Sequence, residues 1–309
     1  MERALNSRDS LCATSAPVDA ASGGYGCWQH LQHVEAFDAR SLLDGRSLVT
    51  SFEVYNDVRL LRQHLERHER TTVLEVGCAA GEFWRYLRIR HPRAEYYGID
   101  VSVPAIARAK GKYPQGRFVA TDASLDLSTV PALMGMPGRP QLVYSKDVVH
   151  HQPHPFGFLT QLLALAEDAL IVRLRTRDYG PTEMDPEWSC QYHYRGWVPY
   201  IVANLDEVIE HVRAHAVDAE VVGYRSHVVL GGAHKRFLPK DCYLPETGTA
   251  ETALGVFRHS GRAGRVAIED RADGMLVRAW DTPVRSALRR IARSFRERRS
   301  SRGVVRSHR

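Results

Sequence analysis

Three carboxylates and two adjacent imidazoles stand at or just beyond the ends of apolar, β-like segments: Glu75, Asp100, Asp122, His150 and His151. A carboxylate accepts hydrogen bonds from sugar hydroxyls or balances a cationic group. An imidazole with a pKa near 6.5 can take a proton from a hydroxyl or an ammonium. Ligands of parallel sheets bind at the carboxyl ends of the strands, so these residue types predict one binding site there.

The stretch Thr72 to Phe83, TVLEVGCAAGEF, predicts a strand, a tight turn and the start of a helix. Glycine at the turn tolerates positive φ, and the helix N-terminus offers unpaired N–H groups to a ligand. A dinucleotide site would need a GxGxxG motif for its pyrophosphate, whereas Gly77 and Gly81 are four residues apart. The carboxylate of Glu75 would repel a pyrophosphate and suits a cationic ligand group.

With Glu75, Gly77, Ala79 and Gly81 the chain resembles the class I S-adenosylmethionine-dependent methyltransferases, whose first motif reads acid, apolar, Gly, x, Gly or Ala, x, Gly. Ala79 stands where many members have a second glycine. The resemblance implies S-adenosyl-L-methionine as the cofactor and S-adenosyl-L-homocysteine as the product. It implies cofactor contacts for twelve residues: Glu75, Gly77, Cys78, Ala79, Gly81, Phe83, Asp100, Val101, Asp122, Ala123, Ser145 and Lys146.

The resemblance also implies separate roles for these residues. Asp100 would accept hydrogen bonds from both ribose hydroxyls. Asp122 would bind the adenine amino group, and the adjacent backbone N–H of Ala123 would meet a ring nitrogen; a helix N-cap is the competing role for Asp122. Ser145 and Lys146 would line the methionine end through backbone contacts.

The segment Leu142 to Pro155 resembles the family segment that passes under the methyl donor, which places His150 and His151 at the mouth of the active site. We expect at least one of them to act as a base, although the reaction can also proceed by proximity and desolvation alone. A metal site that adds His154 is disfavoured because the flanking prolines break any helical register, and we expect no metal.

Strands and helices alternate after the glycine turn, which predicts a parallel sheet with helices on both faces. The resemblance completes it as a Rossmann-like, doubly wound, seven-stranded, mostly parallel sheet, with an N-terminal helical cap and a C-terminal extension. An antiparallel pair closes this sheet in the family, and three segments compete for it: 219–224, 227–230 and 253–258. The other expected strands and helices are 72–76, 95–99, 116–120, 141–144 and 169–174, and 82–90, 103–110, 156–165 and 205–215.

The link between the fifth strand and the helix at 205–215 is unusually long and rich in Tyr and Trp, and such links often carry function. Four of its residues are candidates for the substrate pocket through stacking and hydrogen bonding: Tyr192, His193, Tyr194 and Trp197. The aromatic side chains could equally pack as a lid on the sheet. Both alternatives stay open.

The predicted organisation is a leader (1–24), a helical cap (25–70), a methyltransferase domain (71–262, with the aromatic insertion at 176–203), a candidate β-hairpin (263–284) and a basic amphipathic tail (285–309). The tail holds ten arginines and one acid, a charge of +9 against +6 for the whole chain, so the preceding residues carry −3. The tail could contact an acidic membrane surface or a nucleic acid, or form a solvated extension.

Composition describes an ordinary soluble protein, since 44% of the 309 residues are apolar and 25% are charged. No run approaches the roughly 18 apolar residues of a membrane span, and the first residues lack a signal-peptide core. We therefore expect a cytoplasmic protein. Five scattered cysteines without a CxxC pair indicate neither a disulfide framework nor a zinc site.

The predicted function is methyl transfer to a hydroxyl or amine of a small molecule, sugar or modified peptide, as in natural-product or glycan biosynthesis. Two alternatives remain: methylation of RNA with help from the basic tail, and a non-catalytic scaffold that binds S-adenosylmethionine. The slightly acidic body disfavours nucleic acid as a partner. The oligomeric state is left open by the sequence.

Overall fold

The computed structural model describes residues 39–68, 70–185, 187–193, 196–231 and 236–274. The chain divides into two units, Met1–Arg271 and Ala272–Arg309. All helices and strands below belong to the first unit, and only residues 272–274 of the second are described. The predicted leader and basic tail lie outside the described residues.

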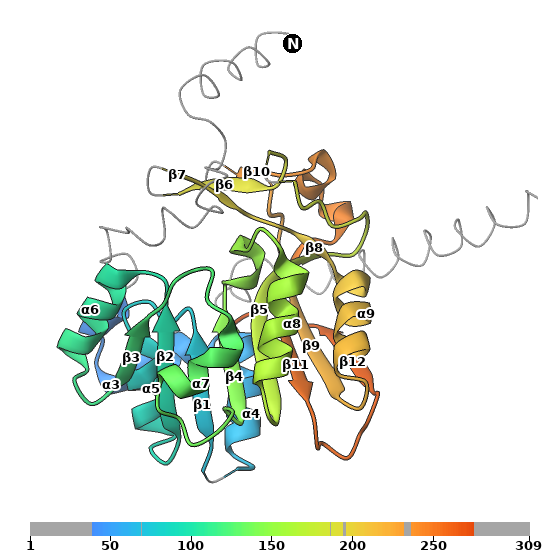
Figure 1. Ribbon diagram of the computed structural model, residues 1–309. Helices are drawn as coiled ribbons and strands as arrows, with labels where there is room; N and C mark the ends of the chain where they lie inside the picture. The colour runs from blue at the N-terminus through green and yellow to red at the C-terminus, as the bar shows by residue number, and fades with distance from the viewer. Residues whose placement is uncertain (1–38, 69, 186, 194–195, 232–235, 275–309) are drawn as a thin grey trace, which may run out of the picture. The chain divides into compact units, whose positions relative to one another are not determined.

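The central sheet follows the order β12-β9-β11-β5-β4-β1-β2-β3, with the short β8 paired to the end of β5 (Figure 1). The five strands β1 to β5 pair in parallel with their neighbours in the sheet. Strand β11 runs antiparallel to both β5 and β9. The strands are β1 (Thr72–Val76), β2 (Glu95–Asp100), β3 (Arg117–Ala120), β4 (Leu142–Lys146), β5 (Ala169–Arg177), β8 (Ala203–Asn204), β9 (Glu220–His227), β11 (Ala250–Phe257) and β12 (Val266–Asp270). The predicted Rossmann-like, mostly parallel sheet is confirmed, and β8 and β12 extend its seven strands.

The antiparallel pair that closes the sheet consists of β9 and β11, in register from Ala250 opposite His227 to Phe257 opposite Glu220. One strand therefore takes most of the segment 219–227, and residues 228–230 form no strand. Strand β12 pairs in parallel with the outer edge of β9. It lies within the expected hairpin 263–284, whose residues after 274 are outside the described part of the chain.

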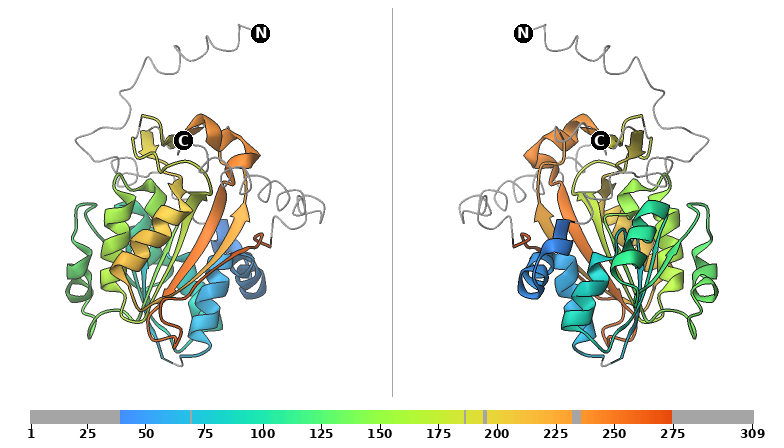
Figure 2. Two further views of the ribbon diagram at one scale, coloured as in Figure 1. Left: turned by 90° about the vertical axis from the view of Figure 1, so that its right-hand side faces the viewer. Right: turned by 90° about the vertical axis from the view of Figure 1, so that its left-hand side faces the viewer.

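Helices cover both faces of the sheet (Figure 2). Alternate strand residues supply the two cores, since Val73 packs with α3–α6 and Leu74 packs with α7–α9. The helices are α3 (Gly45–Glu53), α4 (Asn56–Leu65), α5 (Glu82–Arg90), α6 (Val103–Lys112), α7 (Val130–Leu133), α8 (Pro155–Leu165) and α9 (Leu205–His215). Short 3-10 turns are η3 (Ala39–Leu42), η4 (Leu127–Thr129), η5 (Val149–His151), η6 (Lys240–Tyr243) and η7 (Pro245–Thr247). Within the described residues, every helix is too short or too polar to traverse a bilayer.

The described part of the predicted helical cap contains two helices, α3 and α4. Helix α3 ends at Glu53, and Tyr55 is extended (φ −91°, ψ 142°) before α4 begins. The break lets the two apolar stripes face different partners. Phe52 of α3 packs on rings of α5, while α4 contacts β11 and β5.

The aromatic insertion after β5 forms part of a second, three-stranded sheet in the order β10-β6-β7. Its strands are β6 (Cys190–His193), β7 (Gly196–Pro199) and β10 (Arg236–Phe237). The backbone N–H of Ile201 donates to the carbonyl of His150 at 2.8 Å, which ties this small sheet to the loop after β4. The small sheet therefore lies beside the carboxyl ends of the main strands (Figure 1).

Candidate active site

The turn between β1 and α5 requires left-handed backbone at three positions: Gly77 (φ 87°), Ala79 (φ 45°) and Gly81 (φ 78°). A Cβ on Gly77 would lie 2.3 Å from Val148 Cγ2, so a larger residue there would push the loop after β4 away. The N–H groups of Gly77 and Cys78 donate to the Ile99 carbonyl at 2.8 and 3.0 Å. The turn is thus fixed against the end of β2.

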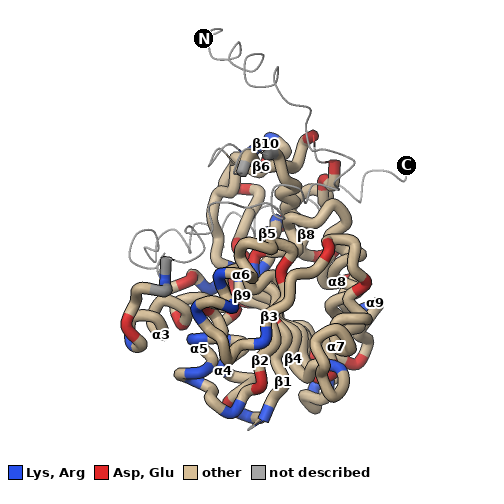
Figure 3. Tube along the Cα trace, turned by 60° about the vertical axis from the view of Figure 1, so that its left-hand side comes forward, with Lys and Arg blue, Asp and Glu red and all other residues tan. Residues whose placement is uncertain are grey.

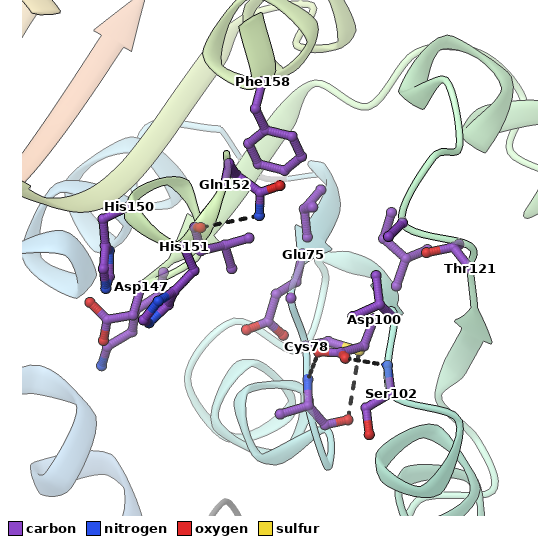
Figure 4. Close-up of a pocket in the computed structure, with 18 of the residues that line it drawn as sticks. Glu75, Cys78, Asp100, Ser102, Thr121, Asp147, His150, His151, Gln152 and Phe158 are labelled. Atoms are coloured by element: carbon purple, nitrogen blue, oxygen red, sulfur yellow. Dashed lines mark hydrogen bonds between the residues drawn. The ribbon is translucent and has the colours of Figure 1, made fainter. Parts of the chain in front are cut away.

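The carboxylate of Asp100 is held by two backbone N–H groups (Figure 4). Ala79 N donates to Oδ2 and Ser102 N donates to Oδ1, both at 2.8 Å. Burial raises the pKa of Asp100, and these hydrogen bonds oppose that rise. Each oxygen keeps a second lone pair, so the carboxylate can still accept from ligand hydroxyls.

Glu75 is a buried carboxyl group at the end of β1, with 6% of its surface exposed. The Tyr96 hydroxyl donates to its Oε2 at 2.5 Å. Burial raises the pKa of Glu75 to about 8, although the Tyr96 hydrogen bond opposes the shift. A cationic ligand group beside Glu75 would restore its charge, because the ligand would replace the lost hydration.

A cavity of about 1210 Å³ opens at the carboxyl ends of β1, β2 and β4. Its lining includes ten of the predicted cofactor residues: Glu75, Gly77, Cys78, Ala79, Phe83, Asp100, Val101, Asp122, Ala123 and Lys146. Gly81 and Ser145 lie just outside it. A Cβ on Gly81 would meet the Phe118 ring at 2.7 Å, and the buried Ser145 hydroxyl donates to the Val76 carbonyl at 3.0 Å. These two residues position the lining.

Asp122 is exposed at the rim of the cavity after β3. Its Oδ1 accepts from the backbone N–H of Ser124 at 2.8 Å and from its hydroxyl at 2.6 Å. These hydrogen bonds lower the pKa of Asp122, so the carboxylate is charged at neutral pH. The neighbouring η4 turn is capped by Asp126 instead, which leaves Asp122 outside the N-cap role considered for it.

Both predicted histidines line the cavity, but their environments differ. His151 Nδ1 lies 2.8 Å from the Pro199 carbonyl oxygen. A carbonyl only accepts, so Nδ1 carries the proton and Nε2 of the neutral ring keeps its lone pair. His150 is 2% exposed, and burial together with His151 and Arg175 lowers its pKa well below the usual value. The two rings pack at 4.1 Å between centroids.

Asp147 follows β4 in a left-handed conformation (φ 58°) and lies on the same side of the pocket as the two imidazoles (Figure 4). Arg175 Nη1 donates to its Oδ1 at 2.8 Å, and Arg173 Nη1 lies 3.5 Å from Oδ2. Burial alone would raise the pKa of Asp147, but Arg175 and Arg173 hold it well below its ordinary range. Arg175 Nε donates to the Tyr200 hydroxyl at 3.0 Å.

The four predicted substrate residues are distributed differently from the expectation. The Tyr192 and Trp197 rings pack edge to face at 5.3 Å, and neither is among the residues that line the cavity. His193 belongs to β6, with its side chain outside the described set, and Tyr194 lies outside the described residues. From this region the cavity takes Gln191, Tyr200 and Arg236 instead.

The helical cap contributes Arg40, Leu43 and Phe52 to the cavity. Arg40 N donates to Glu82 Oε1 at 2.8 Å, and its guanidinium lies 4.8 Å above the Phe52 ring. Lys146 Nζ lies 3.6 Å from the Tyr55 ring centroid. Arg40 and Lys146 are therefore two cations in the lining of the cavity.

Several residues that line the cavity were not predicted from the sequence, among them Arg175, Asp147 and Arg236. The period-2 pattern of Arg173, Arg175 and Arg177 was the available signal, because three arginines on one face of a buried strand must meet acids. In the described part of the chain, no group of three His, Cys, Asp or Glu side chains is arranged to hold a metal ion.

The lining fits S-adenosylmethionine in the chemistry of its groups. Asp100 offers acceptors to ribose hydroxyls, the glycine turn admits a ligand to the backbone, and Glu75 brings a carboxyl group that can pair with a cationic group. A doubly wound sheet that gathers these groups at its carboxyl edge defines a cofactor site of the class I methyltransferase type.

The model of the family described as a methyltransferase domain matches residues 52–215, more than half of the chain. The chain therefore belongs to this family, and it is a class I methyltransferase whose cofactor is S-adenosyl-L-methionine. No curated protein sequence matches the chain.

Three solved structures illustrate the likeness in fold, each with a TM-score of 0.44. The N-terminal domain of EvdMO1 with S-adenosylhomocysteine is 16% identical, over 66% of this chain and 82% of that one. Magnesium protoporphyrin IX methyltransferase from Synechocystis PCC 6803 is 13% identical, over 79% and 100%. The plantazolicin methyltransferase BamL is 14% identical, over 78% and 96%. Likenesses at this level carry nothing about the acceptor.

Proposed function

We propose that this protein methylates a hydroxyl or amine of a small molecule, sugar or modified peptide. The observation that carries the proposal is the cavity itself, which brings the cofactor-type lining and the histidine pair together in about 1210 Å³. That volume exceeds what one small ligand usually fills, so a donor and an acceptor can be held together.

The cofactor, when bound, supplies an electrophilic methyl group on a sulfonium. His151 Nε2 would take the proton of the acceptor hydroxyl or ammonium, while Pro199 holds the ring through Nδ1. Tyr200 and Arg175 would fix the wall against which the acceptor packs. The buried His150 would shape this wall as a neutral ring.

We propose the predicted domain division as the working organisation of the chain. Residues 71–262 would carry the catalytic body, the described part of the cap would close the cofactor side, and the insertion 176–203 would form the acceptor side. The first two assignments are supported by the lining, which takes residues from the cap and from the ends of β1, β2 and β4. Gln191 and Tyr200 support the third.

Methylation of RNA is the alternative outcome. Seen from the side shown in Figure 3, basic and acidic residues are interspersed along the described trace. That distribution suits a small acceptor better than a polyanion. A salt-dependent shift of an RNA probe by the full chain would favour the alternative.

The first test is calorimetric titration with S-adenosylhomocysteine. We expect micromolar binding by the wild type and a loss of roughly 10- to 100-fold in Asp100→Ala, because hydrogen bonds to a charged group contribute about 1.5–3 kcal/mol each. Asp100→Asn keeps the shape and serves as the second variant. Asp218→Ala removes an exposed acid outside the cavity and should bind like the wild type.

Equal binding by wild type and Asp100→Ala would contradict the cofactor site as drawn. Binding without any acceptor turnover would favour the scaffold alternative. Acceptors are then found by incubating candidate pools with S-adenosylmethionine and recording a mass increase of one methyl group.

A further inference from the structure

The two ends of the cavity differ in charge. The cofactor end contributes four acids, Glu75, Glu82, Asp100 and Asp122, against two cations, Arg40 and Lys146. The far end contributes Arg175 and Arg236, and its one lining acid, Asp147, is paired with Arg173 and Arg175. A cationic cofactor suits the acidic end, so the basic end faces the acceptor.

The register of the small sheet explains how Arg236 reaches the cavity. Arg236 lies opposite Gln191, and Gln191 lies opposite Val198, so these three side chains share one face. The other face carries the aromatic contacts of Trp197 with Tyr192 and Phe237. One face of this sheet therefore turns a guanidinium and an amide toward the cavity.

The guanidinium of Arg236 has hydrogen-bond donors to spare. Its Nε donates to Gln191 Oε1 at 3.4 Å, its Nη1 donates to the Leu230 carbonyl at 3.3 Å, and its plane lies 4.3 Å from the Tyr200 ring centroid. A guanidinium has five N–H donors, so these contacts leave both N–H groups of Nη2 and one of Nη1 available. Among the described residues no carboxylate pairs with Arg236, whereas Arg175 in the same wall is paired with Asp147 and Glu251.

We propose that Arg236 and Gln191 bind a carboxylate of the methyl acceptor. This inference rests on the proposed function and names the class of its substrate. A guanidinium presents two parallel N–H groups to a carboxylate, and the Gln191 amide adds a third donor beside them. Binding would place an anion in the basic end of the cavity, where Arg236 has no acid of its own.

Tyr200 is a common neighbour of the proposed carboxylate site and of the histidine pair. Its ring contacts the Arg236 guanidinium and lies 5.0 Å from the His150 ring and 5.6 Å from the His151 ring, between centroids. The carboxylate site and the candidate base therefore share one neighbour. The acceptor is a compact hydroxy or amino acid, or one residue of a peptide, with its carboxylate and its methylated atom on the same small unit.

The carboxylate of the cofactor itself is the competing ligand for Arg236. Arg40 and Lys146 also line the cavity and are the other candidate cations for that group. Measuring the affinity for S-adenosylhomocysteine distinguishes the two alternatives. This affinity depends on Arg236 only if Arg236 contacts the cofactor.

The test uses the full chain saturated with S-adenosylhomocysteine and a panel of hydroxybenzoates, hydroxy acids and amino acids, each paired with its primary amide. Saturation-transfer NMR and calorimetry measure their dissociation constants for the wild type, Arg236→Leu, Arg236→Lys and Arg139→Leu. Arg139 is an exposed arginine that donates to the Ala164 carbonyl outside the cavity, so its variant is the matched control. Circular dichroism verifies folding of each variant.

We expect at least one carboxylate to bind tenfold or more tightly than its amide in the wild type and in Arg139→Leu. The preference should vanish in Arg236→Leu and fall to an intermediate value in Arg236→Lys, with S-adenosylhomocysteine binding changed less than twofold. An undiminished preference in Arg236→Leu, or no carboxylate preference in the wild type, overturns the proposal. So does a tenfold loss of S-adenosylhomocysteine affinity in Arg236→Leu. Failure of the wild type to bind S-adenosylhomocysteine would instead count against the proposed function.

Discussion

His150 and His151 are adjacent in the same loop, but their surroundings differ and suit them to different roles. His151 is half-buried and its Nδ1 donates to a backbone carbonyl, so Nε2 of the neutral ring keeps the lone pair that can accept a proton. His150 is buried, and its Nδ1 has no hydrogen-bond partner among the described residues. Protonating His150 is unfavourable, because the ring is buried and no hydrogen bond from Nδ1 to a described residue would stabilise the charge. We therefore propose His151 as the base.

His151→Ala should lower kcat by roughly 10²- to 10⁴-fold, the usual contribution of a positioned base. Affinity for S-adenosylhomocysteine should stay within twofold, and added imidazole should restore part of the rate. The pH profile of kcat/KM should lose its acidic limb in this variant. The measurement is steady-state turnover of the acceptor identified by mass.

His150→Asn is the control for this assignment, and we expect its rate to fall less than tenfold. A fully active His151→Ala variant would mean that proximity and desolvation alone suffice. The sequence could place both histidines at the site through their position after β4. It could not distinguish them, because the difference depends on Pro199, which is 48 residues away.

At the scale of elements, the turn between β1 and α5 contains a strained residue. Ala79 adopts φ 45° between two glycines that also have positive φ. A residue with a Cβ pays roughly 1–2 kcal/mol for this conformation, whereas glycine does not. The strain persists because the Ala79 N–H is held by Asp100 at 2.8 Å.

Ala79→Gly should therefore raise the free energy of unfolding by roughly 0.5–1 kcal/mol, after allowing for the greater freedom of glycine in the unfolded chain. Ala107→Gly is the control with the opposite sign. Ala107 is exposed within α6, where glycine costs about 1 kcal/mol. Urea denaturation followed by circular dichroism measures both, and equal destabilisation by the two changes would contradict the strain.

The elements of the main sheet could be predicted because each is marked by local chemistry. Gly77 and Gly81 mark the turn between β1 and α5. Helix α9 begins after its N-cap Asn204, whose Oδ1 accepts from the N–H groups of Asp206 and Glu207. The small sheet was not predictable in the same way. Its strand β10 pairs with β6 from 45 residues further along the chain.

That long-range pairing also decides which insertion residues reach the cavity. Aromatic content drew attention to Tyr192 and Trp197, but the alternation of side chains in β6 and β7 points them to the opposite face from Gln191. The aromatic composition drew attention to the insertion as a candidate substrate region. The strand register determines that Gln191, and not Tyr192 or Trp197, lines the cavity. Register depends on the whole sheet and cannot be read from one segment.

At the scale of the whole molecule, buried titratable groups give stability two opposite trends with pH. Burial lowers the pKa of His64 to about 4 and that of His150 well below its usual value. Below pH 6.5 the unfolded chain binds protons that these folded histidines refuse, so stability falls as pH falls. Burial raises the pKa of Glu75 to about 8. The folded chain then keeps a proton that the unfolded chain has lost, so stability falls as pH rises from about 4.3 to 8.

Below pH 6.5 the two histidines outweigh the single carboxyl group. Above pH 6.5 the unfolded histidines lose their remaining protons, and the effect of Glu75 then dominates. The ligand-free protein should therefore be most stable near pH 6.5 and lose about 1 kcal/mol between pH 6.5 and 8. For a domain of this size that loss lowers Tm by roughly 3 °C. Glu75→Gln should remove the alkaline fall, because it has no proton to lose, and should steepen the acidic fall, because Glu75 no longer offsets the two histidines. Thermal unfolding of both proteins across pH 5 to 8.5 measures this, and an alkaline fall preserved in Glu75→Gln would mean that Glu75 is already ionised in the folded chain at neutral pH.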